Sequence, residues 1–161
     1  MKTLILYYSY GGNTRAIAEK MQKALGCDIA AIETLTPYPA DYDAVVEQGQ
    51  NEINRGYEPP IRPLAHDPAG YDAILLGTPV WWYTFAPAVK TALSAIGWAG
   101  KTVYPFATNG GWIGHTFADI KKLCGGAEVK KGLNIQFDEH TLHTAEAAID
   151  RWIAQVRQES I

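Results

Sequence analysis

Short apolar runs alternate with stretches of helical periodicity along this chain. The runs at residues 3–8, 72–77 and 102–107 are rich in branched or aromatic side chains, as expected for strands buried in a parallel sheet. Residues 28–34 and 128–137 mix polar and apolar side chains and are predicted as two further strands, the first at an edge of the sheet. Between and after them, apolar residues recur every three or four positions, which predicts five amphipathic helices. The alternation predicts an α/β fold in which helices cover both faces of a five-stranded parallel sheet.

Turn and capping residues mark where these helices begin and end. Gly26 follows the first helix as a C-terminal cap, Asp41 precedes the second, and Pro87 falls in the first turn of the third. Thr116 and Asp119 resemble a capping pair that opens the fourth helix. The last helix is the clearest, because its apolar residues keep helical register throughout: Ala145, Ala148, Ile149, Trp152, Ile153 and Val156.

A glycine-rich loop joins the first predicted strand to the first helix. At such a junction, backbone N–H groups lack intrahelical partners and the helix dipole is positive, so a bound phosphate is stabilised without a lysine. Glycine allows close approach of the backbone, and serine and threonine hydroxyls add donors. The loop therefore predicts a phosphate site, the alternative being an ordinary turn with an Asn or Thr cap. Its residues are Ser9, Tyr10, Gly11, Gly12, Asn13 and Thr14.

Two further loops follow the third and fourth predicted strands. The carboxyl ends of parallel strands share one edge of a sheet, so all three loops should meet there, where α/β proteins bind ligands. Three of the five tryptophans, Trp81, Trp82 and Trp112, lie in these two loops, which indicates a flat aromatic ligand. The candidate residues are Thr78, Pro79, Val80, Trp81, Trp82 and Tyr83 in one loop, and Thr108, Asn109, Gly110, Gly111 and Gly114 in the other.

Composition limits the classes of protein that fit. The chain has 161 residues, 47% of them hydrophobic, which suits a single domain over 1–161. A formal charge of -3 does not suggest nucleic-acid binding, and no apolar run approaches the roughly 20 residues that span a bilayer. Cys27 and Cys124 have no metal-ligand spacing, so we expect reduced, structural thiols in a cytoplasmic protein without a metal site.

Several nucleotide-binding and hydrolytic families do not match these loops. The first loop lacks the G-x-G-x-x-G of dinucleotide folds, and residues 13–15 are not the Gly-Lys-Ser/Thr of a phosphate-binding NTPase. The third strand ends in Gly77-Thr78-Pro79, without the aspartate that a receiver domain phosphorylates. The G-x-S-x-G nucleophile elbow is also absent.

Three motifs at consistent separations resemble those of the flavodoxins and related FMN proteins. Residues 5–18 follow the flavodoxin phosphate-loop pattern, and residues 79–82 and 108–111 resemble the two flavin-ring loops of one branch of that family. The resemblance implies a sheet order of 2-1-3-4-5 and non-covalent FMN, with its phosphate on residues 9–14. It places the isoalloxazine ring between residues 78–83 and 108–115. Trp81 or Trp82 would stack on the ring.

The resemblance implies an electron-transfer protein that carries electrons between redox partner proteins. The alternative is an NAD(P)H-dependent FMN reductase acting on quinones or similar small acceptors, and a third possibility is a flavin-free scaffold of the same fold. The mild acidity gives the carrier limited support. No catalytic residue is expected, since His115 is better suited to opening the fourth helix. We expect a monomer or weak dimer that contacts neither nucleic acid nor membrane.

Overall fold

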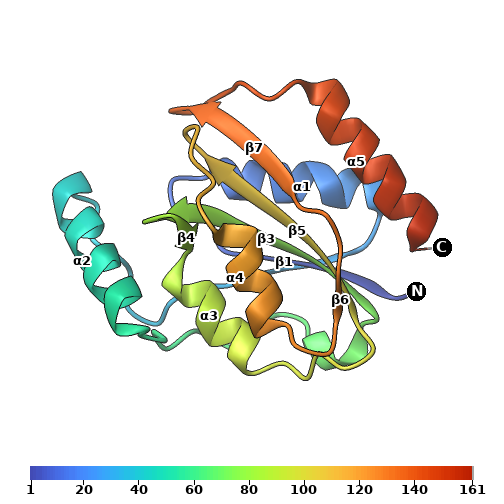
Figure 1. Cartoon of the computed structure of the whole chain (residues 1–161), viewed down its shortest axis with the longest axis horizontal. Coiled ribbons are helices and arrows are strands. Elements are labelled where there is room, and N and C mark those ends of the chain that lie inside the picture. The colour runs from blue at the N-terminus through green and yellow to red at the C-terminus, as the bar shows by residue number, and fades with distance from the viewer. Residues whose placement is uncertain (161) are drawn as a thin grey trace.

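Five long strands form the parallel sheet of the computed structural model, which describes residues 1–160 (Figure 1). They lie in the order β2-β1-β3-β5-β7, which is the predicted order 2-1-3-4-5 for the five main strands. Residue 161, the last of the predicted domain, lies outside the described residues. The strands are β1 (Thr3–Tyr7), β2 (Asp28–Ala31), β3 (Ala73–Trp81), β5 (Thr102–Asn109) and β7 (Leu133–Asp138).

Three short strands were not predicted. β4 (Thr84–Phe85) pairs antiparallel with the end of β3, and β8 (Thr141–Leu142) pairs antiparallel with the end of β7. β6 (Glu128–Val129) pairs with the start of β5. The predicted strand 128–137 is therefore wrong as one element, because it is interrupted at residues 130–132. Gly132 in this interruption leaves room for the ring of Phe117, since a Cβ there would lie 2.6 Å from it.

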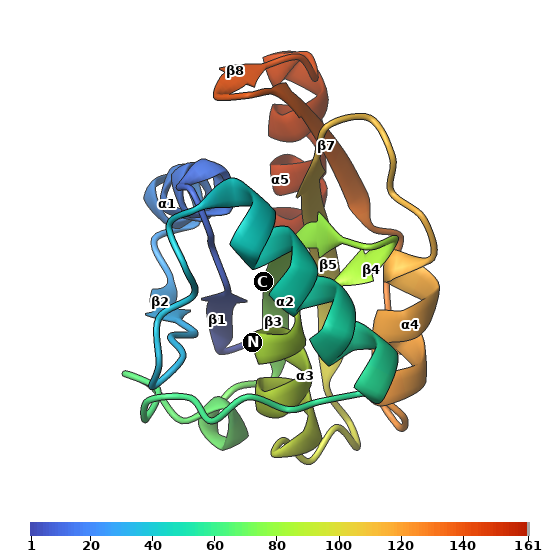
Figure 2. The same cartoon turned by 90° about the vertical axis from the view of Figure 1, so that its left-hand side faces the viewer.

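Helices cover both faces of the sheet, as predicted. α1 (Asn13–Leu25) and α5 (Glu146–Glu159) pack on one face, where Ile17, Met21 and Ile149 are buried against β1 and β3. α3 (Pro87–Ser94) and α4 (Thr116–Leu123) pack on the other face. α2 (Tyr42–Arg55) stands in front of the carboxyl ends of the strands (Figures 1 and 2). A 3-10 turn, Pro68–Gly70, precedes β3.

Alternation along the central strands divides the core into two layers. Leu4, Leu6 and Leu76 are fully buried on the α3 and α4 side, whereas Ile5 and Leu75 are fully buried on the α1 and α5 side. A strand buried on both faces reads as a continuous apolar run, which is why the sequence marks these strands so clearly.

The helix boundaries confirm some capping predictions and overturn another. The Asp41 carboxylate accepts a hydrogen bond from the backbone N–H of Ala44 at 2.9 Å, and Pro87 is the first residue of α3. The capping pair at Thr116 and Asp119 is wrong. α4 is preceded by His115 without a side-chain cap, because the Asp119 carboxylate is bonded to Thr84 and His115 instead.

The cysteines are unpaired, as expected for structural thiols. Cys124 is buried beneath α4, and burial raises the pKa of its thiol to about 12. Cys27 is half-buried, and burial also raises its pKa. Among the described residues, no helix has the length and apolarity needed to cross a membrane.

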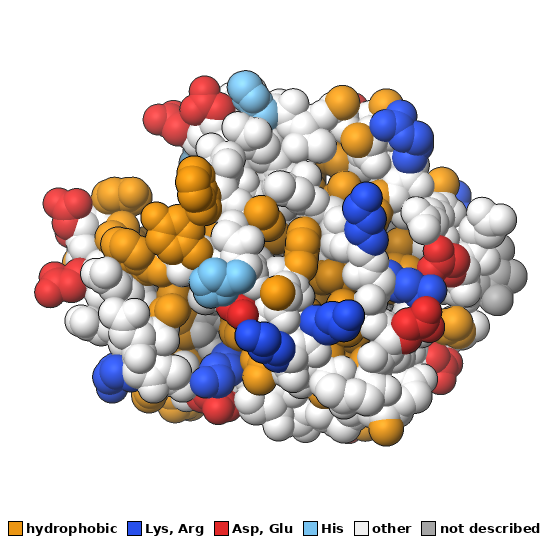
Figure 3. All heavy atoms as spheres, viewed as in Figure 1, with side chains coloured by type: hydrophobic (Ala, Val, Ile, Leu, Met, Phe, Trp, Pro, Cys, Tyr) orange, Lys and Arg blue, Asp and Glu red, His pale blue; other side chains and the backbone are white. Residues whose placement is uncertain are grey.

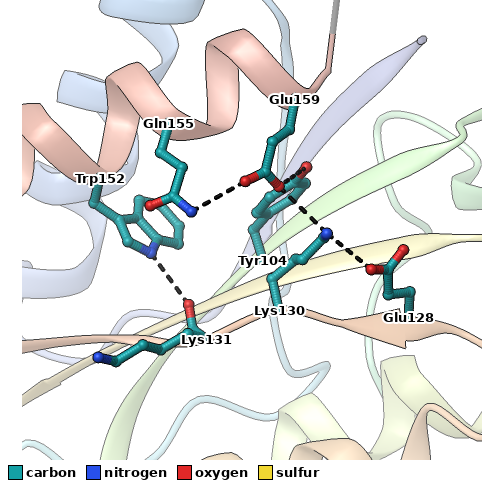
Figure 4. Close-up of polar contacts among 7 residues, drawn as sticks. All are labelled: Tyr104, Glu128, Lys130, Lys131, Trp152, Gln155 and Glu159. Atoms are coloured by element: carbon teal, nitrogen blue, oxygen red, sulfur yellow. Dashed lines mark hydrogen bonds and ion pairs between the residues drawn. The ribbon is translucent and has the colours of Figure 1, made fainter.

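Polar contacts tie the end of α5 to the edge of the sheet (Figure 4). The Glu159 carboxylate accepts hydrogen bonds from the amide of Gln155 at 3.0 Å and the hydroxyl of Tyr104 at 3.1 Å, and Lys130 lies 3.5 Å away. The bond from Gln155, followed by those from Tyr104 and Lys130, holds the pKa of Glu159 below its usual range. The indole N–H of Trp152 donates to the backbone of Lys131 at 3.3 Å.

Replacing Glu159 by Gln should remove an acid-sensitive part of the stability. A carboxylate with a lowered pKa stabilises the fold above its unfolded-state pKa, and this contribution disappears as pH falls through the native-state pKa. We therefore expect E159Q to be less stable than wild type near neutral pH and to match it in acid. Chemical denaturation between about pH 3 and pH 8 measures this difference. The exposed Glu58→Gln is the control, and a parallel offset at every pH would contradict the assignment.

Candidate functional site

The predicted phosphate loop turns sharply between β1 and α1. Gly11 and Gly12 have φ angles of +85° and +100°, which glycine adopts without steric cost. A Cβ built on either residue meets nothing within 4 Å, so the loop faces open space. The two glycines therefore let the backbone bend outward from the carboxyl edge of the sheet and leave room for a ligand.

The backbone donors of this loop remain available. Gly12 is the N-cap of α1 and has no side chain, so the ordinary Asn or Thr cap considered from the sequence is absent. The hydroxyl of Ser9 accepts a hydrogen bond from the N–H of Arg15 at 3.1 Å. Within residues 1–160 the N–H groups of 10–14 have no hydrogen-bond acceptor. An array of free N–H groups at a helix N-terminus fits a phosphate.

A buried contact joins the first and third predicted loops. The hydroxyls of Thr14 and Thr108 lie 2.7 Å apart, and both side chains are almost completely buried. The Thr14 hydroxyl thus has a protein partner, whereas the half-buried Ser9 hydroxyl can still donate a hydrogen bond. The contact fixes the start of α1 against the end of β5.

The β7–β8 hairpin folds over the phosphate loop, which the sequence did not predict. The side-chain amide of Asn13 donates to the carbonyl of Glu139 at 2.7 Å, and the ring of His140 lies 3.0 Å from the Asn13 amide oxygen. Glu139 has a φ of +53°, a conformation in which turns usually place Gly or Asn. Because the turn carries Glu and His instead, its sequence gives no hairpin signal.

Residues 78–83, predicted as a loop, form the end of β3 and a tight turn. The turn residues Trp82 and Tyr83 have φ angles of +46° and +67°, and β4 returns antiparallel beside β3. A left-handed conformation at a non-glycine residue costs of the order of 1–3 kcal/mol. Thr78 is buried, and its hydroxyl accepts from the N–H of Ala86 at 3.1 Å. Strain is therefore concentrated where the ring loop was predicted.

Trp81 points inward beneath α2. Its ring makes edge-to-face contacts with Tyr8, Tyr10 and Tyr38, with centroids 5.9, 5.9 and 5.0 Å away. Gly49 of α2 provides the space, since a Cβ there would lie 3.1 Å from the indole. Trp81 thus sets the separation between α2 and the sheet.

The neighbouring aromatic side chains are exposed. The exposed fractions are 40% for Trp82, 50% for Tyr83 and 69% for Trp112. The rings of Tyr83 and Trp112 pack edge to face, with their centroids 6.0 Å apart. The indole N–H of Trp82 donates a hydrogen bond to the carbonyl of Val46 in α2 at 3.1 Å. Figure 3 shows hydrophobic side chains gathered on this side of the molecule, beyond the carboxyl ends of the strands. These rings are the surfaces on which a planar ligand could stack.

The third predicted loop packs directly on the second. Gly114 has a φ of +58°, and a Cβ there would lie 2.3 Å from the carbonyl oxygen of Tyr83. That oxygen accepts a hydrogen bond from the N–H of His115 at 2.8 Å. Earlier in the loop, the Asn109 side chain accepts from the N–H of Gly111 at 2.9 Å, closing a local turn.

His115 and Asp119 form a pair at the start of α4. The Nδ1 atom of His115 contacts the Asp119 carboxylate, and the same carboxylate accepts a hydrogen bond from the hydroxyl of Thr84 at 2.6 Å. His115 precedes α4, as expected from the sequence, and its side chain is mostly exposed. The sequence did not predict that Asp119 would hold this ring.

Two cavities adjoin the aromatic residues. One of about 420 Å³ lies between α2 and the end of β3, and it is lined by Tyr10, Tyr42, Val46, Val80, Trp81 and Trp82 among others. The second, of about 360 Å³, lies between α2, α3 and α4. The first includes four of the residues predicted from the sequence to contact a ligand, and the second includes none of them.

The three predicted segments therefore meet at one edge of the sheet. Thr14 and Thr108 join the first segment to the third, and Gly114 packs the third against Tyr83 of the second. A family model described as flavodoxin matches residues 2–156. The chain belongs to the flavodoxin family. The resemblance seen in the sequence is thereby confirmed, whereas the contact of each site residue with a flavin stays a prediction.

Solved structures similar to this flavodoxin include two flavoproteins. One from Lactobacillus acidophilus NCFM, in complex with FMN, is 25% identical with a TM-score of 0.76, covering 94% of this chain and 97% of that one. One from Bacteroides eggerthii DSM 20697 is 30% identical with a TM-score of 0.79, covering 96% and 97%. An NADH:FMN oxidoreductase, 13% identical with a TM-score of 0.62 and coverage of 99% and 90%, shares the fold. Comparison with curated proteins found no match.

Replacing Gly114 by Ala should separate the two ring loops of this flavodoxin. The added Cβ collides with the backbone of Tyr83 and adopts an unfavourable φ, so we expect a loss of about 2–3 kcal/mol in unfolding free energy. Denaturant unfolding measures the loss, and titration with FMN should show weaker binding. Gly110→Ala in the same loop is the matched control for stability, because its Cβ meets nothing within 4 Å. An equal loss of unfolding free energy in the two variants would contradict the role of Gly114.

Proposed function

We propose that this flavodoxin binds FMN and transfers electrons, acting as a carrier between redox proteins. Its family and the FMN complex of the similar Lactobacillus flavoprotein support FMN as the cofactor. Bound FMN supplies the one- and two-electron chemistry, while the protein binds, orients and shields it. We further propose that the chain forms a single domain, acts in the cytoplasm and exchanges electrons with a redox protein or a small electron acceptor.

The phosphate of FMN fits the open loop at residues 9–14. The free N–H groups and the helix N-terminus stabilise its charge, and the hydroxyl of Ser9 adds a donor. The ring would lie between the β3–β4 turn and the Gly114 segment. Backbone groups of both segments could then read its polar edge, so no charged side chain is required there.

The exposed aromatic rings are the observation that favours an electron carrier over a reductase. Trp82, Tyr83 and Trp112 surround the predicted ring site and remain open to solvent on the outer side. Contiguous exposed aromatic surface marks sites of contact with other proteins, and aromatic residues are enriched in such interfaces. A partner docking on these rings would come close to the flavin edge.

The cavity between α2 and β3 favours a second candidate, an NAD(P)H-dependent reductase of quinones or similar small acceptors. It measures about 420 Å³ and is bounded by Tyr10, Trp81 and Trp82. This volume lies within the range of small-molecule sites. A nicotinamide or quinone ring could enter it beside the predicted flavin position.

Anaerobic mixing of the FMN-loaded protein with NADH or NADPH distinguishes the two candidates. For a carrier we expect the flavin absorbance to remain unchanged over minutes, although dithionite bleaches it. Stopped-flow absorbance at the flavin band gives the measurement. Bleaching by either nicotinamide within seconds, at cofactor concentrations near 1 mM or below, would favour the reductase and contradict the carrier.

Replacing Ser9 by Ala should weaken FMN more than riboflavin. The substitution removes a donor to a charged phosphate, and such hydrogen bonds contribute about 1.5–3 kcal/mol, equivalent to at least a tenfold change in dissociation constant. Riboflavin lacks the phosphate and should bind the variant as it binds wild type. Flavin fluorescence quenching measures both affinities. Equal loss for the two ligands would place the phosphate away from Ser9.

A further inference from the structure

The cavity between α2, α3 and α4 is a second concave site beside the predicted flavin site. Its volume is about 360 Å³, and apolar side chains, among them Ile53, Phe85 and Leu123, line it. This volume lies at the lower end of the range that binds small molecules. The cavity could enclose the apolar part of a ligand, about the size of one or two fused rings.

The cavity adjoins the flavin segments and shares one residue with them, His115, the last of residues 108–115. Its wall includes Thr84 and Phe85, which directly follow the strained turn, and His115, which directly follows Gly114. None of the residues predicted to bind FMN lines it. The cavity therefore borders the predicted flavin site.

The two carboxylates of the cavity already have partners. Glu52 is buried, and its two oxygens accept hydrogen bonds from the hydroxyl of Tyr38 at 2.5 Å and the amide of Gln48 at 2.8 Å. Asp119 is bonded to Thr84 and His115, as described above. The oxygens of both acids therefore already serve as hydrogen-bond acceptors.

The basic groups of the cavity retain free donors. The ammonium of Lys90 makes one hydrogen bond, to the carbonyl of Gly56 at 3.0 Å, and has two further N–H donors. Within the part of the chain that the structure describes, the side chain of Lys122 makes no hydrogen bond or ion pair. Figure 3 shows basic side chains around a histidine and an acidic group over α3 and α4. Donors without acid partners beside an apolar wall match an amphipathic anion.

We propose that this cavity binds a small organic anion with an apolar body, such as an aromatic carboxylate. The body lies against Phe85 and Leu123, and the anionic group takes hydrogen bonds from Lys90 and Lys122. Binding needs no electron transfer, so this proposal stands apart from the carrier function. Its failure would leave the FMN and nicotinamide experiments unaffected.

Calorimetric titration of the FMN-loaded protein with 2-naphthoate tests the proposal. Saturation with FMN keeps the probe out of the flavin site. The isosteric neutral amide, 2-naphthamide, measures the contribution of the apolar body alone. We expect the carboxylate to bind about tenfold more tightly than the amide at low salt, because charge-assisted hydrogen bonds are stronger than neutral ones.

Substitutions of single lysines test which side chains bind the carboxylate of the probe. Lys122→Gln and Lys90→Gln should each remove most of the preference for the carboxylate, to within about threefold of the amide. Lys121→Gln is the matched control, because Lys121 is the adjacent exposed residue of α4 and does not line the cavity. Amide NMR shifts should change for residues at Phe85 and Leu123 and remain unchanged at Val46 in the other cavity.

Three results would overturn the proposal. The first is no binding of 2-naphthoate up to millimolar concentration. The second is equal affinity for the carboxylate and the amide in wild type. The third is a loss in Lys121→Gln as large as that in Lys122→Gln, which would show a general effect of surface charge.

Discussion

The buried contact between the hydroxyls of Thr14 and Thr108 fixes the geometry of the whole ligand edge. β1 and β5 flank β3, so this hydrogen bond bridges over the end of the strand between them. An apolar pair at this position would pack but would not define one relative orientation, whereas a buried hydroxyl pair tolerates little displacement. The start of α1 and the third segment are therefore held at one separation. Gly114 then extends the same constraint to Tyr83, and through it to the β3–β4 turn.

The β3–β4 turn and the phosphate loop use their backbone conformations in different ways. Trp82 and Tyr83 hold left-handed conformations that cost free energy, and their surroundings stabilise them through Val46, Trp112 and His115. In return, two rigid aromatic side chains are presented outward from a short hairpin. The phosphate loop makes the opposite use of its backbone. Gly11 and Gly12 adopt their conformations without strain and leave donors free for a ligand. An ordered turn at one end of the site and free N–H donors at the other suit a cofactor that is bound at both its ring and its phosphate.

The sequence predicted the features that depend on local pattern. Buried parallel strands read as apolar runs, which marks the central strands β1, β3 and β5, and the order of the five main strands followed from the family resemblance. Features that depend on distant partners could not be read in this way. Asn13 meets the hairpin tip at Glu139, 126 residues away, and the turn at Trp82 and Tyr83 contains no glycine. Asp119 was predicted to cap α4, but tertiary contacts with Thr84 and His115 take its carboxylate. Trp81 and Trp82 are adjacent in sequence, and tertiary packing against Gly49 and three tyrosines turns Trp81 inward.

The tryptophans fall into two groups that should differ in how a bound flavin affects their fluorescence. Trp81, Trp82 and Trp112 lie at the carboxyl edge, close to the predicted flavin. Trp98 is buried and donates its N–H to the carbonyl of Leu93, and Trp152 lies on α5 beside Tyr104. Excitation energy passes from an indole to a nearby flavin far more efficiently than to a distant one. Fluorescence from the three indoles at the edge should therefore respond more strongly to a flavin bound there than fluorescence from Trp98 and Trp152.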